Sequence, residues 1–335
     1  MVIYERDIAV DMGTSNTLVF SQGKGLVLRE PTVVAVDKVK DKMLKIGEEA
    51  KKTLGRTPAN VIAIHPIRAG VISDYDMSAL MLRELVSRIT SFSLFKPRIL
   101  MCVPSSITGV EERAVIDAAI EAGARRVYLV ETAVATAIGA GVDIKKPDGH
   151  MVVDIGGGST DIAVISMGGR VKAASVPVAG NAFDRCIAQY VQEKFQIAIG
   201  PLTAEALKKQ VACCTKSEFE GVMEVRGHSW ETNLPARHVI YTRDLYEPVQ
   251  ELASRIAASA RAVLESTPPE LAADVSSSGV LLTGGGSLLR GLASYLAGEL
   301  HVDVAIAPDP LNCVARGTAI SLSEGRYLTA GFRDA

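Results

Sequence analysis

Residues 154–161 read D-I-G-G-G-S-T-D, and this short stretch decides how the whole chain is interpreted. Three consecutive glycines follow an apolar run and stand between Asp154 and Asp161. Ordering glycine costs more backbone entropy than ordering any other residue, so the position should need something that only glycine supplies. A turn rich in Gly, Ser and Thr presents free backbone N–H groups in a concave nest that binds phosphate oxygens. The stretch therefore predicts a phosphate-binding turn.

The same plan occurs near the start of the chain. The segment D-M-G-T-S-N-T at residues 11–17 lies between the β-rich runs 8–10 and 17–20. Because the runs 150–155 and 161–166 flank G-G-G-S-T in the same way, both segments predict a strand, a tight turn and a returning strand. Two such units, one early and one in the middle, predict an internal duplication with a cleft between the halves.

A third glycine cluster, T-G-G-G-S at residues 283–287, follows an apolar strand and precedes a helical pattern at 287–300. One D-x-G turn is weak evidence, because many hairpins use Asp-Gly chemistry. Three clusters after apolar strands are much stronger evidence for a polyphosphate site. The pattern is neither a P-loop nor a G-x-G-x-x-G that opens a βαβ unit. The candidate nucleotide-binding residues of the three clusters are Gly13, Thr14, Ser15, Asn16, Gly156, Gly157, Gly158, Ser159, Gly284, Gly285, Gly286 and Ser287.

Asp11 and Asp154 begin the first two turns. Carboxylates beside a polyphosphate make sense when Mg²⁺ lies between them, held through water. The hydroxyls of Thr14, Ser15 and Ser159 would add donors for the phosphate oxygens. We expect the two turns to contact the β- and γ-phosphates from opposite sides, and the third cluster to lie against the nucleoside or the α-phosphate.

The rest of the chain alternates predicted strands and helices, which favours α/β layers. The polar segment 217–243 has strand-like stretches at 221–225 and 237–242 and predicts a small appended subdomain, irregular in structure. Strands are predicted at 98–103 and 127–130, and helices at 77–91, 110–122, 133–140, 182–196, 203–212, 244–267 and 287–300.

Composition bounds the class of protein. A chain of 335 residues suggests about two domains, and 48% apolar residues suffice for substantial cores. The net charge of −2, with both signs mixed, argues against a nucleic-acid partner. The five cysteines lack the paired spacing of a zinc site, and Cys213 and Cys214 are expected to be ordinary buried or half-buried thiols rather than a redox pair.

The start of the chain predicts no signal peptide, because Glu5, Arg6 and Asp7 interrupt the apolar residues. The sequence holds no run of eighteen apolar residues, so no membrane span is expected. We expect a cytoplasmic protein.

Three motifs carry a resemblance to a known family. D-M-G-T-S-N-T, D-I-G-G-G-S-T-D and L-L-T-G-G-G-S-L-L-R resemble the phosphate-1, phosphate-2 and adenosine motifs of the actin-like ATPase superfamily. Within it the chain is similar to the MreB/Mbl family of bacterial cell-shape proteins, over nearly its whole length. The strings that carry this similarity are E-P-T-V-V-A-V at 30–36, R-A-G-V-I-S-D-Y at 68–75, V-P-S-S-I-T at 103–108, T-P-P-E-L-A-A-D at 267–274 and C-V-A-R-G at 313–317.

The resemblance implies a duplicated α/β fold of the actin-like, ribonuclease H-like type. Two domains, each with a five-stranded sheet, would enclose a nucleotide cleft, and each would carry a smaller subdomain, making four in all. Domain I would comprise residues 1–143 plus 310–335, with its small subdomain at about 31–75. Domain II would comprise residues 144–309, with its small subdomain at about 181–245.

The resemblance also implies cofactors and partners. The cleft would hold ATP or GTP, which phosphate motifs do not distinguish, together with Mg²⁺. The protein would polymerise into antiparallel double protofilaments on the inner face of the cell membrane. There it would act with the cell-wall elongation machinery to maintain rod shape.

The resemblance assigns a nucleoside contact to T-A-E-A-L-K at residues 203–208. Glu205 would contact the ribose hydroxyls, and Lys208 would lie beside the base. The alternative is an E-x-x-K ion pair on a solvated helix face. The family has Glu where this chain has Gln210, a change with a modest expected effect.

One departure from the family concerns hydrolysis. Family members carry Glu-Glu-Pro where this chain has Glu131, Thr132 and Ala133, and the second glutamate is thought to orient the attacking water. A hydroxyl is a poor general base near neutral pH. Thr132 has another interpretation, as the N-cap of the following helix. The resemblance makes Glu131, Thr132, Thr160 and Asp161 the catalytic candidates, Asp161 standing where the family has Glu; we expect nucleotide binding with slow or absent hydrolysis.

The loop S-F-S-L-F-K-P-R at residues 91–98 is a candidate membrane contact. Apolar Leu94 and Phe95 would insert at the lipid interface while Lys96 and Arg98 meet anionic head groups. The alternative is a loop whose apolar side chains fold back onto the core. The resemblance favours membrane contact.

Other functions share such a cleft. A metabolite kinase would need an aspartate base facing a small-substrate pocket, and the sequence identifies none. A heat-shock chaperone would need a substrate-binding domain after the ATPase core, whereas this sequence stops at Ala335. A filament protein for plasmid or organelle positioning is a closer rival, and the extensive match to cell-shape proteins argues against it.

Overall fold

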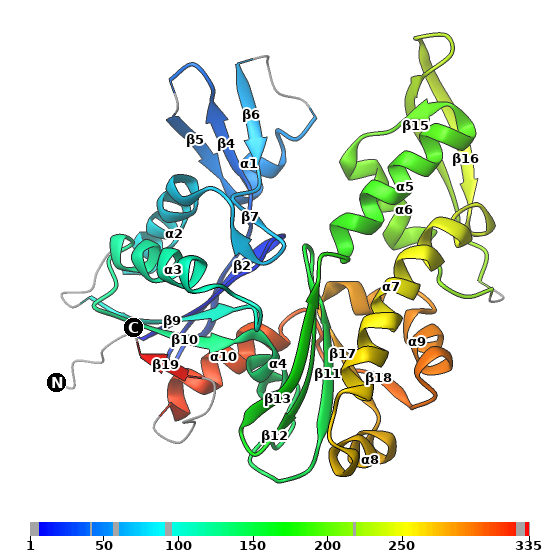
Figure 1. Ribbon diagram of the computed structural model, residues 1–335. Helices are drawn as coiled ribbons and strands as arrows, with labels where there is room; N and C mark the ends of the chain where they lie inside the picture. The colour runs from blue at the N-terminus through cyan, green and yellow to red at the C-terminus, as the bar shows by residue number, and fades with distance from the viewer. Residues whose placement is uncertain are drawn as a thin grey trace.

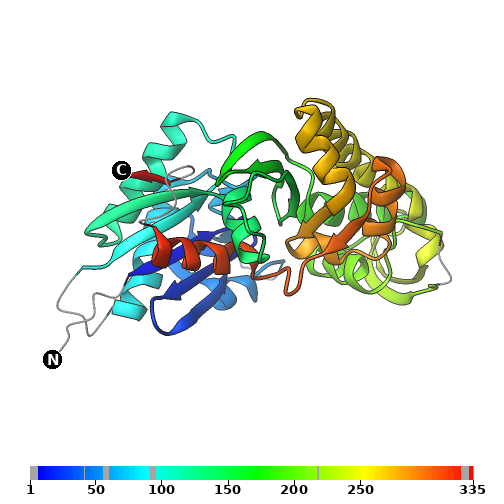
Figure 2. The same cartoon turned by 90° about the horizontal axis from the view of Figure 1, so that it is seen from below.

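The computed structural model describes residues 7–40, 42–55, 60–90, 96–216, 219–325 and 332–334. In Figure 1 the chain forms two lobes side by side, each with a large β-sheet below and a smaller sheet above. Figure 2 shows the same lobes from below. The C-terminal helix α10 (Cys313–Glu324) returns to lie under the first lobe, beside strand β1 (Ile8–Met12).

The large sheet of the first lobe has the order β19-β10-β9-β1-β2-β3. β1, β2 and β3 form an antiparallel meander, whereas β9 runs parallel to β1 and to β10. Helices α2 (Tyr75–Thr90) and α3 (Gly109–Glu121) pack on this sheet, α2 through fully buried Leu82 and Leu85 and α3 through buried Ala119. The remaining strands are β2 (Asn16–Ser21), β3 (Gly25–Pro31), β9 (Arg98–Val103), β10 (Arg126–Glu131) and β19 (Phe332–Asp334).

The large sheet of the second lobe repeats this plan in the order β13-β12-β11-β17-β18. Its first three strands again form an antiparallel meander, and β17 and β18 are parallel to β11. Helix α7 (Tyr246–Glu265) places Val249, Leu252 and Ile256 at helical spacing in the core of this lobe. The remaining elements are β11 (His150–Ile155), β12 (Thr160–Ser166), β13 (Gly169–Val176), β17 (Val280–Thr283), β18 (Val304–Ile306), α8 (Pro269–Ser278) and α9 (Leu292–Leu300). The expected duplication is confirmed.

Helix α4 (Thr132–Gly139) joins the two large sheets. Its side chains share one core with Leu100 of the first sheet and Val152 of the second. α4 crosses α10 at close range, because a Cβ on Gly139 would lie 1.8 Å from the Cys313 carbonyl oxygen. Only glycine permits this approach of two helix backbones.

Each lobe carries a three-stranded sheet above its large one (Figure 1). The first contains β4 (Val34–Asp37), β5 (Lys42–Ile46) and β6 (Val61–Ile64) with helix α1 (Gly47–Lys51), and the short strands β7 (Ile67–Arg68) and β8 (Val71–Ile72) follow it. The second contains β14 (Ile197–Ala198), β15 (Val222–Ser229) and β16 (Pro235–Tyr241), with helices α5 (Gly180–Phe195) and α6 (Pro201–Gln210) and the 3₁₀ turn η1 (Thr242–Asp244).

Several local predictions were wrong. The helix predicted at 287–300 begins only at Leu292, after the 3₁₀ turn η2 (Gly285–Leu288), because Gly291 adopts a left-handed φ of 73°. Helix α8 was missed although Pro269 is well suited to a first helical position. The strand-like stretches predicted at 221–225 and 237–242 are confirmed, because they fall on the paired strands β15 (Val222–Ser229) and β16 (Pro235–Tyr241); only the irregularity expected for the rest of this segment was wrong, since β15 extends the hairpin to Ser229. β19 makes the first large sheet six-stranded rather than five-stranded.

Two sequence expectations concern features outside the cleft. Cys213 and Cys214 are buried thiols that belong to no disulfide among the described residues, as predicted. Among the described residues, no helix is both long and apolar enough to cross a membrane. Leu94 and Phe95 lie outside the described residues, and the domain division at residues 143/144 and 309/310 stays a prediction.

Candidate functional site

A cavity of about 540 Å³ lies between the two lobes. All three glycine turns reach its wall: the first turn (residues 13–16), the second turn (156–159) and the third turn (284–287). The predicted site residues on the wall are Asp11, Gly13, Thr14, Ser15, Asn16, Thr132, Asp154, Gly156, Gly157, Gly158, Ser159, Asp161, Glu205, Lys208, Gly284, Gly285 and Gly286. Glu131, Thr160 and Ser287 do not line it.

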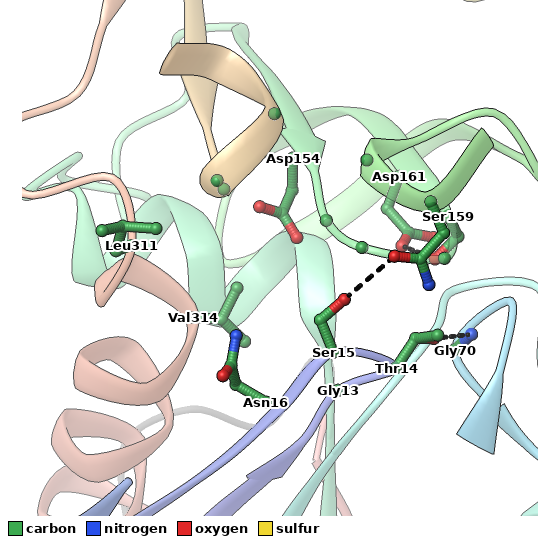
Figure 3. Close-up of a pocket in the computed structure, with 18 of the residues that line it drawn as sticks. Gly13, Thr14, Ser15, Asn16, Gly70, Asp154, Ser159, Asp161, Leu311 and Val314 are labelled. Carbon is green, nitrogen blue, oxygen red and sulfur yellow. Dashed lines mark hydrogen bonds between the residues drawn. The ribbon is translucent and has the colours of Figure 1, made fainter. Parts of the chain in front are cut away.

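The first and second turns contact each other directly. A Cβ built on Gly157 would lie 1.9 Å from Ser15 Oγ, and one on Gly158 would lie 2.3 Å from Thr14 Oγ1. Both distances are far shorter than any van der Waals contact, so these positions need glycine. Ser15 also donates a 3.4 Å hydrogen bond to Asn181 of α5, across the cleft (Figure 3).

Two carboxylates stand at the base of these turns. Burial, with repulsion from Asp154, raises the pKa of Asp11 to about 7. Burial, with repulsion from Asp161, raises the pKa of Asp154 to about 7, although Thr283 Oγ1 donates to it at 2.9 Å. In the described part of the chain, no lysine or arginine forms an ion pair with either aspartate. A cation between them would relieve both the burial and the repulsion.

The residues after the second turn differ in what they face. Ser159 Oγ donates to Asp161 Oδ2 at 3.2 Å, and both residues line the cavity. Burial raises the pKa of Asp161 above its ordinary value, although hydrogen bonds from Ser175 and Ser159 oppose this. Thr160 is fully buried and donates to the Val178 carbonyl at 2.6 Å, so its hydroxyl is used inside the lobe rather than in the cavity.

Of the neighbouring residues Glu131 and Thr132, one faces the cavity and the other does not. Thr132 lines the cavity, and its hydroxyl accepts from Cys102 Sγ at 3.3 Å. Burial raises the pKa of Cys102 well above its ordinary value, so the thiol stays protonated as the donor. Glu131 turns away from the cavity and pairs with Arg170 Nε at 3.2 Å. The N-cap prediction for Thr132 was wrong: Glu131 holds the extended cap position, so Thr132 is the first residue of α4.

At the other end of the cavity, α6 supplies charged side chains. Lys208 Nζ lies 2.8 Å from Asp184 and donates to the Gly180 carbonyl at 3.0 Å. Glu205 pairs with Lys209 at 2.5 Å and, across the cleft, with Lys51 of α1 at 3.8 Å. The predicted alternative, a Glu205–Lys208 pair, is therefore wrong, because each residue has other partners.

The third turn packs against the end of β11. A Cβ on Gly286 would lie 2.2 Å from Ile155 Cγ2, and Gly284 has a φ of 76°, so both positions favour glycine. Ser287 is fully buried and donates to the Gly284 carbonyl at 2.7 Å, which keeps it off the cavity wall.

Sequence reasoning missed part of the wall. The missed residues that share it include Cys102, Pro104, Asn181, Asp184, Leu288, Leu311 and Val314. Leu288 and Leu311 are about half exposed there and give this end an apolar surface suited to a flat base. Leu288 and Val314 carried a local signal, because they lie inside the L-L-T-G-G-G-S-L-L-R and C-V-A-R-G strings, and Leu311 stands two residues before the second string.

Two duplicated lobes that close on a cavity through paired hairpin turns and a third glycine turn define the actin-like class of protein. Comparison with solved structures agrees. The chain superimposes on MreB5 of Spiroplasma citri bound to ADP with a TM-score of 0.92 and 34% identity, covering 95% of this chain and 96% of that one. A structure of the MamK double helical filament, 22% identical with a TM-score of 0.77, shares the fold.

Sequence comparison identifies the family. The model for the MreB/Mbl protein family matches residues 5–329. The cell shape-determining protein Mbl of Bacillus subtilis (strain 168) is 44% identical over 321 residues, covering 96% of each chain. The cell shape-determining protein MreB of Escherichia coli (strain K12) is 41% identical, covering 94% of this chain and 92% of that protein. This chain belongs to the MreB/Mbl family.

Proposed function

We propose that the cavity binds ATP, or a similar nucleoside triphosphate, between the first and second turns. The observation that carries this proposal is the meeting of two duplicated turns above two carboxylates that no described cation neutralises. The related MreB5 structures with ADP and with AMPPNP bound support it. The apolar surface of Leu288 and Leu311 would take the base, and Glu205 and Lys208 would contact the nucleoside.

The carboxylates fit a hard divalent cation. Mg²⁺ in phosphate sites takes one or two carboxylates plus phosphate oxygens and keeps several waters. Asp11 and Asp154 match this need, and their raised pKa values mean that a cation would release protons as it bound. When bound, Mg²⁺ would neutralise phosphate charge.

Hydrolysis is proposed to be slow. Thr132 is the only residue of the Glu131–Thr132 pair on the cavity wall, and its hydroxyl already accepts from Cys102. Glu131 does not substitute for a missing base, because its carboxylate pairs with Arg170 outside the cavity. The Thr160 hydroxyl donates to the Val178 carbonyl, so Thr160 would contact the nucleotide only through its backbone.

The protein is further proposed to assemble with itself into antiparallel double protofilaments on the inner face of the cell membrane, where they organise cell-wall synthesis and cell shape. The cell shape-determining relatives and the shared fold of the MamK filament support this role. Membrane contact is assigned to Leu94 and Phe95, which are followed by the exposed cation Lys96.

One experiment tests the core of this proposal. Equilibrium binding of a fluorescent ATP analogue is measured with and without Mg²⁺, with ATP, GTP and ADP as competitors, and the same samples are imaged by electron microscopy. We expect saturable binding that Mg²⁺ strengthens, slow phosphate release, and paired filaments. Absence of saturable binding would exclude the nucleotide site, and single particles at saturating nucleotide would exclude the filament.

A second experiment tests the membrane contact. Leu94→Ser/Phe95→Ser is expected to lower co-sedimentation with anionic vesicles without changing nucleotide affinity, because the apolar side chains supply the insertion. Met167→Ser is the matched control, since Met167 is an exposed apolar residue on the other lobe. Equal sedimentation of the double variant and the wild type would contradict the assignment.

A further inference from the structure

Arg170 crosses from one lobe to the other. It lies near the start of β13, the edge strand of the second large sheet. Its side chain reaches two partners in the first lobe: Nη1 donates to the Ser105 carbonyl at 2.9 Å, and Nε lies 3.2 Å from Glu131 Oε2. The Glu131 side chain is only 13% exposed, so its carboxylate is held against protein rather than free in water.

Both partners of Arg170 directly adjoin residues of the cavity wall. Ser105 follows Pro104, and Glu131 precedes Thr132; Pro104 and Thr132 line the cavity. The two segments leave the sheet side by side, because Glu131 pairs in register with Val103. Arg170 thus donates a hydrogen bond to the Ser105 carbonyl, whereas its contact with Glu131 Oε2 is an ion pair without a hydrogen bond in the described part of the chain. Because the guanidinium is rigid and planar, one side chain that contacts both groups limits their relative position.

The same wall region contacts the second turn. A Cβ on Gly70 would lie 2.9 Å from Pro104 Cγ and 3.2 Å from Ser159 Oγ. Gly70 N also donates to Thr14 Oγ1 at 3.0 Å (Figure 3). Gly70 therefore places Pro104 at the end of the cavity where both turns meet, and Thr132, whose hydroxyl accepts from Cys102 of the strand leading to Pro104, lines the same cavity.

Arg170 and Ser159 are joined through one hairpin. β12 and β13 pair along their length, from Thr160 opposite Val176 to Ser166 opposite Gly169. The hairpin thus carries the second turn at its cavity end and Arg170 at its other end. Ser159 and Arg170 therefore belong to one continuous sheet segment, and Arg170 connects that segment to the residues next to Pro104 and Thr132.

We propose that Arg170 is a positioning residue that sets Pro104 and Thr132 against the second turn, and so lets the cavity distinguish a nucleoside triphosphate from a diphosphate. The inference rests on the proposed nucleotide site. Glu131 then acts as the partner of Arg170 and not as a base. Because Arg170 is 36% exposed, its ion pair contributes little to stability, and its effect is on the terminal-phosphate contact.

The test compares the affinities of ATP and ADP, each with Mg²⁺, in wild type, Arg170→Met and Arg170→Lys. Arg170→Met is expected to weaken the affinity for ATP about five-fold, or about 1 kcal/mol, and to leave the affinity for ADP unchanged. Arg170→Lys should give an intermediate ATP:ADP ratio, because a single ammonium cannot hold both partners in the guanidinium geometry. Arg226→Met is the matched control, since Arg226 pairs with Glu224 inside one lobe, and it should leave the ratio at the wild-type value.

A double-mutant cycle separates positioning from a general structural role. In the wild-type background, Glu131→Gln should lower the ratio of the ATP affinity to the ADP affinity. In the Arg170→Met background it should change this affinity ratio little, because both substitutions interrupt the same contact. Equal loss of ATP and ADP affinity in Arg170→Met and Arg170→Lys, or an unchanged ratio in both, would overturn the inference while leaving the nucleotide site intact. Failure of the wild type to bind either nucleotide would instead overturn the proposed function, and this inference with it.

Discussion

The first and second turns share one backbone conformation but differ in their central residues, which carry side chains in the first turn and are glycines in the second. Each closes with the same backbone hydrogen bond, from Gly13 N to the Asn16 carbonyl at 3.1 Å and from Gly156 N to the Ser159 carbonyl at 3.0 Å. Between these bonds the first turn has Thr14 and Ser15, whereas the second turn has two glycines.

The contact between the turns explains this difference. The second residue of the first turn, Thr14, meets the third residue of the second turn, Gly158; Ser15 meets Gly157 in the reverse order. Such reciprocal pairing is what a two-fold relation between two copies produces. Because the copies touch at these positions, only one of them can carry side chains there. The glycine run thus answers a packing requirement of the duplicated fold, in addition to offering N–H groups to phosphate.

The largest expected effect comes from filling the glycine side of this contact. Gly158→Ala places a methyl group 2.3 Å from Thr14 Oγ1, so the turns must separate. We expect affinity for the ATP analogue to fall by about 100-fold, roughly 3 kcal/mol, the upper range for overpacking. Calorimetric titration measures the change.

A swap variant makes this prediction specific to the contact. Thr14→Gly/Gly158→Thr moves the side chain to the opposite turn and should recover part of the lost affinity. Gly298→Ala is the matched control, because the space around Gly298 is open and helix α9 accepts alanine. If Gly158→Ala binds as tightly as Gly298→Ala, the turns do not meet as described.

The next effect concerns the rate of nucleotide hydrolysis. If the two turns bind phosphate but supply no base, this rate should depend on the side chain at the neighbouring Thr132. Thr132→Glu is expected to raise phosphate release about ten-fold or more, because a carboxylate at the cavity wall is a far better base than a hydroxyl. Glu131→Ala is the comparison variant and should not abolish turnover. A wild type as fast as Thr132→Glu, or turnover that disappears in Glu131→Ala, would show that the base lies elsewhere.

A smaller effect is expected from the two carboxylates below the turns, and it concerns how the stability of the protein depends on pH. In the folded protein the pKa values of Asp11 and Asp154 are about 7, above the ordinary 3.8, so between these values the folded state binds more protons than the unfolded one. Without nucleotide, the free energy of unfolding should therefore fall as pH rises from about 4 to 7. Asp154→Asn removes one charge and should be more stable than wild type at pH 8, by on the order of 1 kcal/mol, and equally stable at pH 4.

The same carboxylates predict the pH dependence of binding. Mg²⁺ requires the ionised forms, so affinity for the Mg²⁺-nucleotide should rise between about pH 6 and 8. Asp154→Asn should lose the Mg²⁺-dependent part of binding while gaining stability. Urea unfolding and titration at several pH values measure both. A variant less stable than wild type at pH 8, or one that keeps its Mg²⁺ dependence, would contradict the role assigned to Asp154.

The turns and their strands were predictable because their signals are local. Each unit consists of an apolar strand, a glycine-rich turn and a returning strand rich in β-branched residues, all within about a dozen residues. The duplication was predicted because this pattern occurs twice. The outward direction of Glu131 was not predictable, because its partner Arg170 is far away in the chain. The same holds for Lys208, which pairs with Asp184 on another helix rather than with its helix neighbour Glu205.

The sequence by itself determined the α/β class, the two homologous halves, the three glycine turns and the family, since these depend on residue patterns along the chain. Only the tertiary structure decided which polar groups face the cavity and which are used inside a lobe, as the buried hydroxyls of Thr160 and Ser287 show. It also decided why one turn has glycine where the other has side chains. Hydrogen bonds and steric contacts between distant segments depend on relative placement, which no local pattern encodes.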